Sequence, residues 1–228
     1  MAANTDKKPN VGSNTAFVVA EIAVIAAIFI ADAKGFIPFS KTPFLLAFGW
    51  LSMRIHGVTW KSTGLRVYRN WQMTLALGLA AGGALEAIEL FITQPVLTHL
   101  FHQPADLSTF NGLKGHLQPT LLFIGLAWTL AAFGEEMVYR GYLMNRVAGL
   151  FHGARRPWIL SLILVHAVFG LAHAYQGVTG VVDEGLMGLL LGVIYLRTDR
   201  CLAVPIVAHG IQDTIDFFLI FSGHYPGM

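Results

Sequence analysis

The sequence predicts an all-α, polytopic membrane protein: a bundle of about seven transmembrane helices forming a single membrane-embedded domain over residues 1–228. Three observations support this fold class. The chain is 55% hydrophobic and only 12% charged, with a mean hydropathy of +0.60, a composition unlike that of soluble globular proteins. Seven apolar segments approach the ~20 residues that a bilayer-spanning helix needs. The polar stretches between them are too short to form a soluble domain.

The seven predicted helices differ in how well their ends are marked. They comprise residues 16–31, 36–53, 73–97, 117–140, 158–175, 177–196 and 202–222. Pro38 and Pro43 interrupt the second segment early, so it is either shorter or re-entrant. Nothing breaks the fourth pattern before Gly149, so one long helix is expected to reach Leu150. Glycines in the sixth segment predict close packing against neighbouring helices; they are Gly177, Gly180, Gly185, Gly188 and Gly192.

The distribution of positive charge predicts the orientation. With seven spans, twelve of the fifteen lysines and arginines fall on one side, which the positive-inside rule makes cytoplasmic. Only Lys34, Lys41 and Lys114 fall on the other side. The polar tail of residues 1–15 is therefore expected in the cytoplasm, and a bacterial plasma membrane is the expected location.

The first segment has an alternative interpretation as a cleaved signal peptide, because two lysines precede an apolar run that ends in Ala31-Asp32-Ala33. Glu21 within the run and the length of the polar lead favour a retained span. The net charge of +2, with no basic run among aromatic residues, disfavours a nucleic-acid partner. The single cysteine, Cys201, excludes an intrachain disulfide and is expected to be a small hydrophobe near a helix start.

Nine of the thirteen acidic residues fall inside the apolar segments. They are Glu21, Glu86, Glu89, Glu135, Glu136, Asp183, Glu184, Asp213 and Asp216. A charge at the bilayer centre costs ~2.5–3.5 kcal/mol, so several of these acids are expected to be paired or to face a polar cavity. For Glu21, Asp183 and Glu184 the alternative is a position near the interface or a protonated side chain.

The fourth segment contains Glu135-Glu136 followed by Arg140. On an α-helix Glu136 and Arg140 are four residues apart with the acid first, the favourable order for an ion pair. Glu135 projects about 100° away, so its carboxylate is free to accept a proton from water, as a general base must. The alternative is a structural salt bridge with a spare acid beside it.

Histidines in the fifth and seventh segments complete the set of candidate catalytic residues. Phe169 and His173 are one turn apart, with His166 on the same face, where a packing role is the simpler interpretation for His166. His209 and Asp213 are also four apart, which suits an oriented acid or base, an oxyanion donor, half a metal site, or a pair that only stabilises the bundle.

The depth of these residues allows them to meet. Measured from the expected cytoplasmic ends of their helices, Glu135, His173 and His209 lie ~16, ~22 and ~12 Å into the membrane, a spread that helix tilt can absorb. The sequence therefore predicts one buried site built from three helices.

These three strings, in this order, resemble the signature motifs of the CPBP intramembrane proteases, which include CAAX prenyl endopeptidases and bacteriocin-processing proteins and are also called the Abi family. The motifs are Glu-Glu-x-x-x-Arg-Gly, Phe-x-x-x-His and His-x-x-x-Asp. The resemblance covers the motif core at residues 117–222. It implies an endopeptidase acting on a membrane-associated protein or peptide, with prenylated CAAX-type proteins among the candidate substrates.

The resemblance also implies catalytic roles. Glu135 would activate the attacking water, His173 would help to hold it, and Glu136 and Arg140 would support them. His209 and the fourth residue of the third motif would bind the oxyanion. That residue is Asp213, where prenyl endopeptidases more often carry asparagine, and an ionised aspartate cannot donate a hydrogen bond. Asp213 is therefore protonated, orients His209, or marks a bacterial subgroup.

Metal dependence stays open at this point. The family is called a metalloprotease family, yet a mechanism without metal has been argued for it, and two histidines and a carboxylate would suit a catalytic zinc. His99, His102 and His116 lie in a loop and are expected to be exposed rather than ligands.

Two other functions compete with that of a protease. One is a proton- or cation-coupled transporter, based on Glu86, Glu89, Asp213 and Asp216, and the other is an inactive scaffold.

Overall fold

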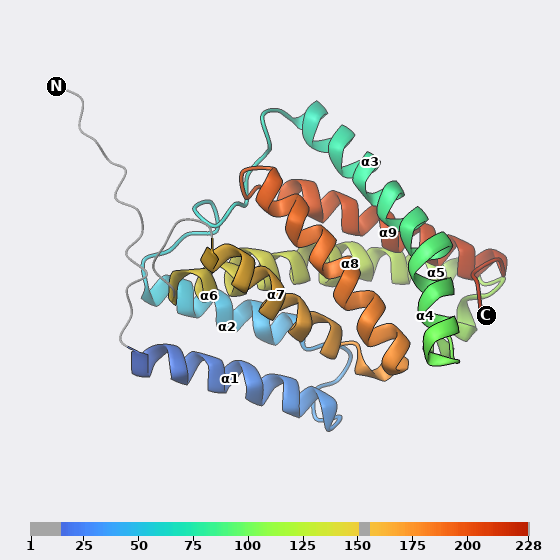
Figure 1. The fold of residues 1–228 in the computed structure, drawn as a ribbon, viewed down its shortest axis with the longest axis horizontal. Coiled ribbons are helices and arrows are strands. Elements are labelled where there is room, and N and C mark those ends of the chain that lie inside the picture. The colour runs from blue at the N-terminus through green and yellow to red at the C-terminus, as the bar shows by residue number, and fades with distance from the viewer. Residues whose placement is uncertain (1–14, 151–155, 228) are drawn as a thin grey trace.

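The computed structural model describes residues 15–150 and 156–227, which form a bundle of helices (Figure 1). The tail predicted over residues 1–15 lies almost wholly outside the described residues. All regular secondary structure in the described residues is helical, and none of it is a strand, which confirms the all-α class.

Thirteen helical elements follow one another along the described residues. In order they are α1 (Thr15–Ala33), α2 (Thr42–Ile55), α3 (Trp71–Ile88), the π-helix η1 (Glu89–Thr93), α4 (Gln94–Phe101), the 3₁₀-helix η2 (Ser108–Leu113), α5 (Leu117–Leu126), the π-helix η3 (Ala127–Met144), α6 (Asn145–Leu150), α7 (Arg156–Leu171), the 3₁₀-helix η4 (Ala174–Gln176), α8 (Gly177–Arg197) and α9 (Ala203–Ser222).

Four continuous helices of the described residues are long and apolar enough to cross a membrane. They are Trp71–Phe101, Leu117–Leu150, Ala174–Arg197 and Ala203–Ser222. They correspond to the third, fourth, sixth and seventh predicted spans, and the fourth reaches Leu150 as expected. α7 is apolar but has only 16 residues. The total of seven spans stays a prediction.

The second and fifth predicted segments differ from the structure at one end. The second segment starts as a helix at Thr42 rather than at residue 36, because Pro43 suits only the first turn of a helix; this matches the shorter of its two alternatives. The fifth helix ends at Leu171 rather than at residue 175, so His173 lies in the turn that follows. The chain must reverse there, because Gly170 packs directly against Gly185 of α8.

The middle of the fourth helix is π-helical rather than α-helical. In η3 each N–H bonds to the carbonyl five residues back, so a turn holds more residues than an α-turn. Twelve of its residues are buried, including all of 136–144. π-Helical segments within α-helices are frequent at functional sites, and η3 contains Glu135, Glu136 and Arg140.

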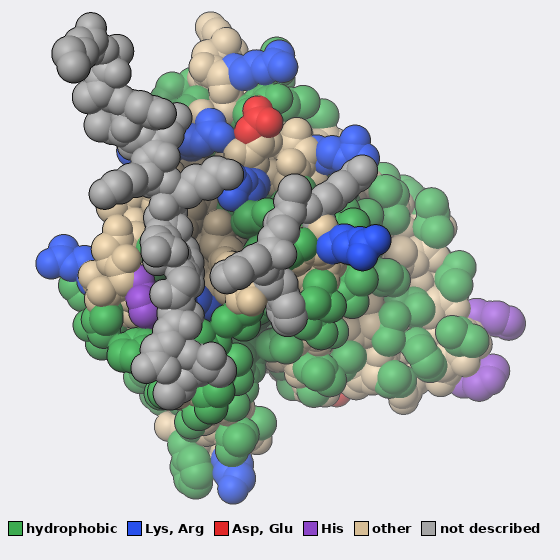
Figure 2. All heavy atoms as spheres, turned by 60° about the vertical axis from the view of Figure 1, so that its left-hand side comes forward, with side chains coloured by type: hydrophobic (Ala, Val, Ile, Leu, Met, Phe, Trp, Pro, Cys, Tyr) green, Lys and Arg blue, Asp and Glu red, His purple; other side chains and the backbone are tan. Residues whose placement is uncertain are grey.

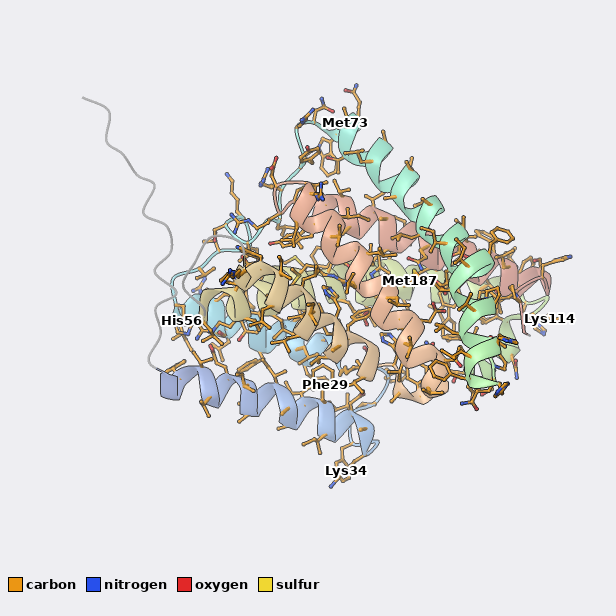
Figure 3. The ribbon with its side chains drawn as sticks, viewed as in Figure 1. Phe29, Lys34, His56, Met73, Lys114 and Met187 are labelled. Carbon is orange, nitrogen blue, oxygen red and sulfur yellow. The ribbon has the colours of Figure 1, made fainter. Side chains whose placement is uncertain are left out.

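The helices pack unequally around the motif-bearing segments. α3 packs most extensively against α9, and α7 against α8, while α1 lies along one edge of the bundle beside α2 (Figure 1). A small apolar cluster of Leu85, Met187, Leu191 and Ala208 joins α3, α8 and α9. Met187 marks the middle of the bundle in Figure 3.

Basic side chains gather at one end of the molecule, where Figure 2 shows lysines and arginines above a broad hydrophobic surface. His56 lies at this end and Lys114 at the opposite one (Figure 3). The exposed basic residues on the predicted cytoplasmic side are Arg54, Lys61, Arg66, Arg69, Arg156, Arg197 and Arg200. Arg140 and Arg146, counted with them from the sequence, are instead buried in ion pairs. The direction in which this end faces stays a prediction.

The predicted close packing of the sixth segment is present at three of its glycines. Gly185 lies against Gly170, and Gly188 and Gly192 lie against the rings of Phe169 and His166. Gly177 differs, because it has φ +78° and a Cβ at this position would have no neighbour within 4 Å.

Replacing Gly192 with alanine is expected to lower the free energy of unfolding by ~1–3 kcal/mol, the usual cost of overpacking. A Cβ at this position would collide with the His166 imidazole and with Leu162. Gly83→Ala in α3 is the control, since a Cβ there meets nothing within 4 Å. Thermal unfolding in detergent measures both variants. Equal stability of the two would contradict the close α7–α8 contact.

Candidate active site

The centre of the candidate site is a buried ion pair on η3. Arg140 Nη1 donates to Glu136 Oε1 at 2.8 Å, and both side chains have no exposed surface. Arg140 Nη2 donates to the Gly188 carbonyl of α8 at 2.6 Å. The guanidinium also lies 5.0 Å from the centre of the Phe169 ring on α7. The first motif is thereby joined to two neighbouring helices.

His209 extends this network to α9. Its Nδ1 lies 3.0 Å from Glu136 Oε1, the same oxygen that Arg140 contacts. Its Nε2 lies 3.6 Å from Asp213 Oδ1 one turn along the helix. The imidazole is therefore placed between two carboxylates, and only the contact to Asp213 could be anticipated from spacing within the motif.

Glu135 lies at the edge of this buried network. Its side chain is partly exposed, and Thr42 Oγ1 donates to its Oε1 in a long hydrogen bond of 3.5 Å. A carboxylate with so few protein contacts can accept a hydrogen bond from water. Thr42 is a site residue that sequence reasoning missed, because it lies 93 positions away on a helix outside the three motifs.

His173 is oriented by its own helix end. Its Nδ1 donates to the Phe169 carbonyl at 2.9 Å, and the two rings lie 4.8 Å apart. Since Nδ1 carries the hydrogen, the neutral ring presents the lone pair of Nε2, which can accept a hydrogen bond from water. The second motif thus positions a histidine even though α7 ends before it.

The start of α2 connects Glu135 and His173. Lys41 Nζ donates to the Ala172 carbonyl at 3.2 Å and pairs with Asp32 at 3.1 Å. Lys41 therefore contacts the residue before His173, while the next residue, Thr42, contacts Glu135. Asp213 lies within electrostatic range of both Glu135 and His173. The six predicted residues accordingly share one region of the bundle.

His173, His209 and a carboxylate do not form a compact set of metal ligands. The Nδ1 hydrogen bonds of the two histidines, to Phe169 and to Glu136, would leave Nε2 of each ring free to bind zinc, but the donor atoms are not close enough to one another. Within residues 15–150 and 156–227, one group of three ligating side chains has donor atoms within 4.8 Å of one another, and it is Glu86, Glu89 and Asp216. No catalytic step below is therefore assigned to a metal.

Other histidines have the roles expected of them. His166 is buried against Gly188 and Gly192 with Nδ1 bonded to the Leu162 carbonyl at 2.6 Å, as a packing residue would be. His99, His102 and His116 are exposed as expected, but His99 lies in the last turn of α4 rather than in a loop, because the third helical span continues to Phe101. Cys201 is buried, as predicted for a small hydrophobe.

Glu21 belongs to a second, separate polar cluster at the basic end. Its carboxylate accepts from Arg146 Nε at 2.6 Å and from Ser52, and lies 3.2 Å from His56 Nε2. A cavity of about 30 Å³ beside this cluster has room for about one water molecule and is far too small for a peptide. Glu21 is thus a paired acid that anchors α1, not a candidate catalytic residue.

Comparison with known proteins supports a protease. Residues 117–215 match the family model described as type II CAAX prenyl endopeptidase Rce1-like. No curated protein and no solved structure matches the chain. The matched segment begins at α5 and includes all three motifs, so this part of the chain is similar to the Rce1-like type II CAAX prenyl endopeptidases.

Proposed function

We propose that this chain is an intramembrane endopeptidase that hydrolyses a peptide bond in a membrane-associated protein or peptide, with Glu135 activating the attacking water. The observation that carries the proposal is the convergence of the three motifs. A buried Glu136–Arg140–His209 network adjoins two partly exposed groups, Glu135 and His173, that can bind water.

The first step needs a base and a positioned water. Glu135 takes a proton from a water that also donates to Nε2 of His173, and the resulting hydroxide attacks the carbonyl carbon of the scissile bond. The carbonyl oxygen becomes an oxyanion. Glu135 then returns the proton to the leaving nitrogen, the C–N bond breaks, and the products are an amine and a carboxylic acid, which loses its proton to water.

His209 is proposed to stabilise the oxyanion as an imidazolium. Its Nδ1 must donate to Glu136, because a carboxylate paired with Arg140 only accepts hydrogen bonds. Donation to an oxyanion therefore requires a second hydrogen on Nε2. Asp213, 3.6 Å from Nε2, would orient and balance this cation, a role for which an acid is better suited than asparagine.

Arg140 and Glu136 are proposed as positioning residues. They touch no reacting atom in this scheme, but their ion pair holds His209 in place and links η3 to α8. Because His209 is already held in place, it can donate to the oxyanion with little rearrangement during the reaction. Such preorganisation is the main source of electrostatic catalysis.

A prenylated CAAX-type substrate is supported only by the family description. We propose that the protein acts in a bacterial plasma membrane with its amino terminus in the cytoplasm.

The experiment that tests the proposed function is incubation of the purified protein with lipidated and unlipidated versions of the same peptides, with and without chelator. We expect cleavage that persists in chelator. Proton flux in vesicles without cleavage of any peptide would favour a transporter instead.

A further inference from the structure

Three carboxylates meet within the bundle, apart from the proposed active site. Glu86 lies near the end of α3, Glu89 begins η1, and Asp216 lies on α9. One carboxylate oxygen from each residue lies within 4.8 Å of the other two. Glu86 is 3% exposed, and neither of its carboxylate oxygens has a hydrogen-bond partner, nor does Oδ1 of Asp216. Glu86 and Asp216 are close enough to share a proton, and no side chain that donates a hydrogen bond reaches Glu86 among the described residues.

No basic side chain compensates this cluster among the described residues. The ion pairs present there use Glu21, Asp32, Glu136 and Asp213, and none uses a member of the trio. Asp183 lies within electrostatic range of Glu86 and Glu89 and adds a further acid. Desolvated carboxylates repel one another, so the cluster is stable only when it binds protons or a cation.

Two glutamine side chains orient one of the three carboxylates, that of Glu89, and leave the other two free. Gln94 and Gln212 both donate to Glu89, one to each carboxylate oxygen. Gln94 also donates to the hydroxyl of Tyr225, a buried residue beyond the end of α9. Glu89 is therefore oriented by amides, while Glu86 and Asp216 keep oxygens available to a ligand.

We infer that Glu86, Glu89 and Asp216 form a binding site for a divalent cation that prefers oxygen ligands. Donor oxygens within 4.8 Å of one another can share a coordination sphere of the Ca²⁺ type, in which each ligand lies at ~2.3–2.6 Å. An all-carboxylate set suits Ca²⁺, Mg²⁺ or Mn²⁺ and not a soft metal. Waters would complete the coordination on the side where Asp216 is partly exposed.

The site would stabilise the bundle rather than take part in proteolysis. Asp216 is seven residues beyond His209, or ~10 Å further along α9. A cation held there would join α3 to α9, the two helices that pack most extensively against each other (Figure 1). This inference is independent of the proposed function.

The test is thermal unfolding and elemental analysis of the purified full-length protein in detergent. After treatment with chelator, Ca²⁺, Mg²⁺ and Mn²⁺ are added back in separate samples. At one hundred times its Kd, the bound ion is expected to raise Tm by ~5–10 °C, with about one ion retained per chain after desalting. Glu86→Gln and Asp216→Asn are expected to lose both the shift and the bound ion.

The controls separate binding from folding. Asp106→Asn, which changes an exposed loop acid, should keep the full shift. In chelator, Glu86→Gln should be at least as stable as the unmodified protein, because it removes one of the repelling charges. The inference is overturned if none of the three ions raises Tm, which would mean that protons alone neutralise the cluster. It is also overturned if the shift survives in both variants.

Discussion

Glu135→Gln is expected to lower the rate of peptide cleavage by ~10²–10⁴-fold, the usual contribution of a general base. Glutamine keeps the shape of the side chain and can still accept from Thr42, but it cannot accept a proton from water. The only hydrogen bond of Glu135 to another described side chain is the long one to Thr42, so Tm should change little. Cleavage of a reporter peptide by the purified protein measures the effect.

Glu184→Gln is a matched control for this variant. Glu184 is also a partly exposed glutamate of the bundle, but it is bonded to Gln176 at 3.1 Å and has no proposed role in the reaction. Its variant should retain activity close to that of the unmodified protein. If Glu135→Gln cleaves the peptide as fast as Glu184→Gln does, Glu135 is not the base.

Arg140→Met is expected to lower the free energy of unfolding by ~3–5 kcal/mol, because it leaves the Glu136 carboxylate buried without its main counter-charge. The guanidinium has no exposed surface and also loses its contacts to Gly188 and the Phe169 ring. A decrease in Tm of ~6–20 °C should follow. Activity should fall as well, since His209 loses the support of the fixed Glu136.

A double-mutant cycle identifies the cause of this loss. Glu136→Gln combined with Arg140→Met removes both charges, so the double variant should be more stable than Arg140→Met alone. If the two single losses simply add, the pair is not coupled, and the destabilisation of Arg140→Met reflects lost packing.

Most of the helices could be predicted from the sequence because a membrane helix is recognisable by its length and apolarity. The spans at 117–150, 177–197 and 203–222 match their predicted segments within a few residues. The six candidate site residues could also be proposed from the sequence, because polar groups in apolar segments are costly and stand out and because these six fall in the three motifs. The resemblance to a protease family rested on those same residues and is matched by the family model.

Contacts between helices were less predictable. The hydrogen bond of His209 to Glu136 joins residues 73 positions apart, and that of Thr42 to Glu135 joins residues 93 positions apart. The π-helical geometry of η3 has no local sequence signal, since its buried side chains are held by α2, α7 and α9. The end of α7 at Leu171 follows Gly170, but a single glycine does not by itself end a helix, and the close contact of Gly170 with α8 is visible only in the structure.

The acidic residues show both what could be predicted from the sequence and what could not. Their placement in apolar segments predicted that they would be paired or would face a polar space, and Glu21 and Glu136 are indeed paired. The grouping of Glu86 with Glu89 follows from their spacing of three residues. Their approach to Asp216 depends on the packing of α3 against α9, which the sequence alone does not specify.

The most direct test of the central claim is mass spectrometry of a membrane-associated peptide incubated with the purified protein in water enriched in heavy oxygen. Attack by a water activated at Glu135 predicts two fragments, with one heavy oxygen in the new carboxyl group, and no fragments from Glu135→Gln. An intact peptide with the unmodified protein, or fragments that form equally with Glu135→Gln, would contradict the account.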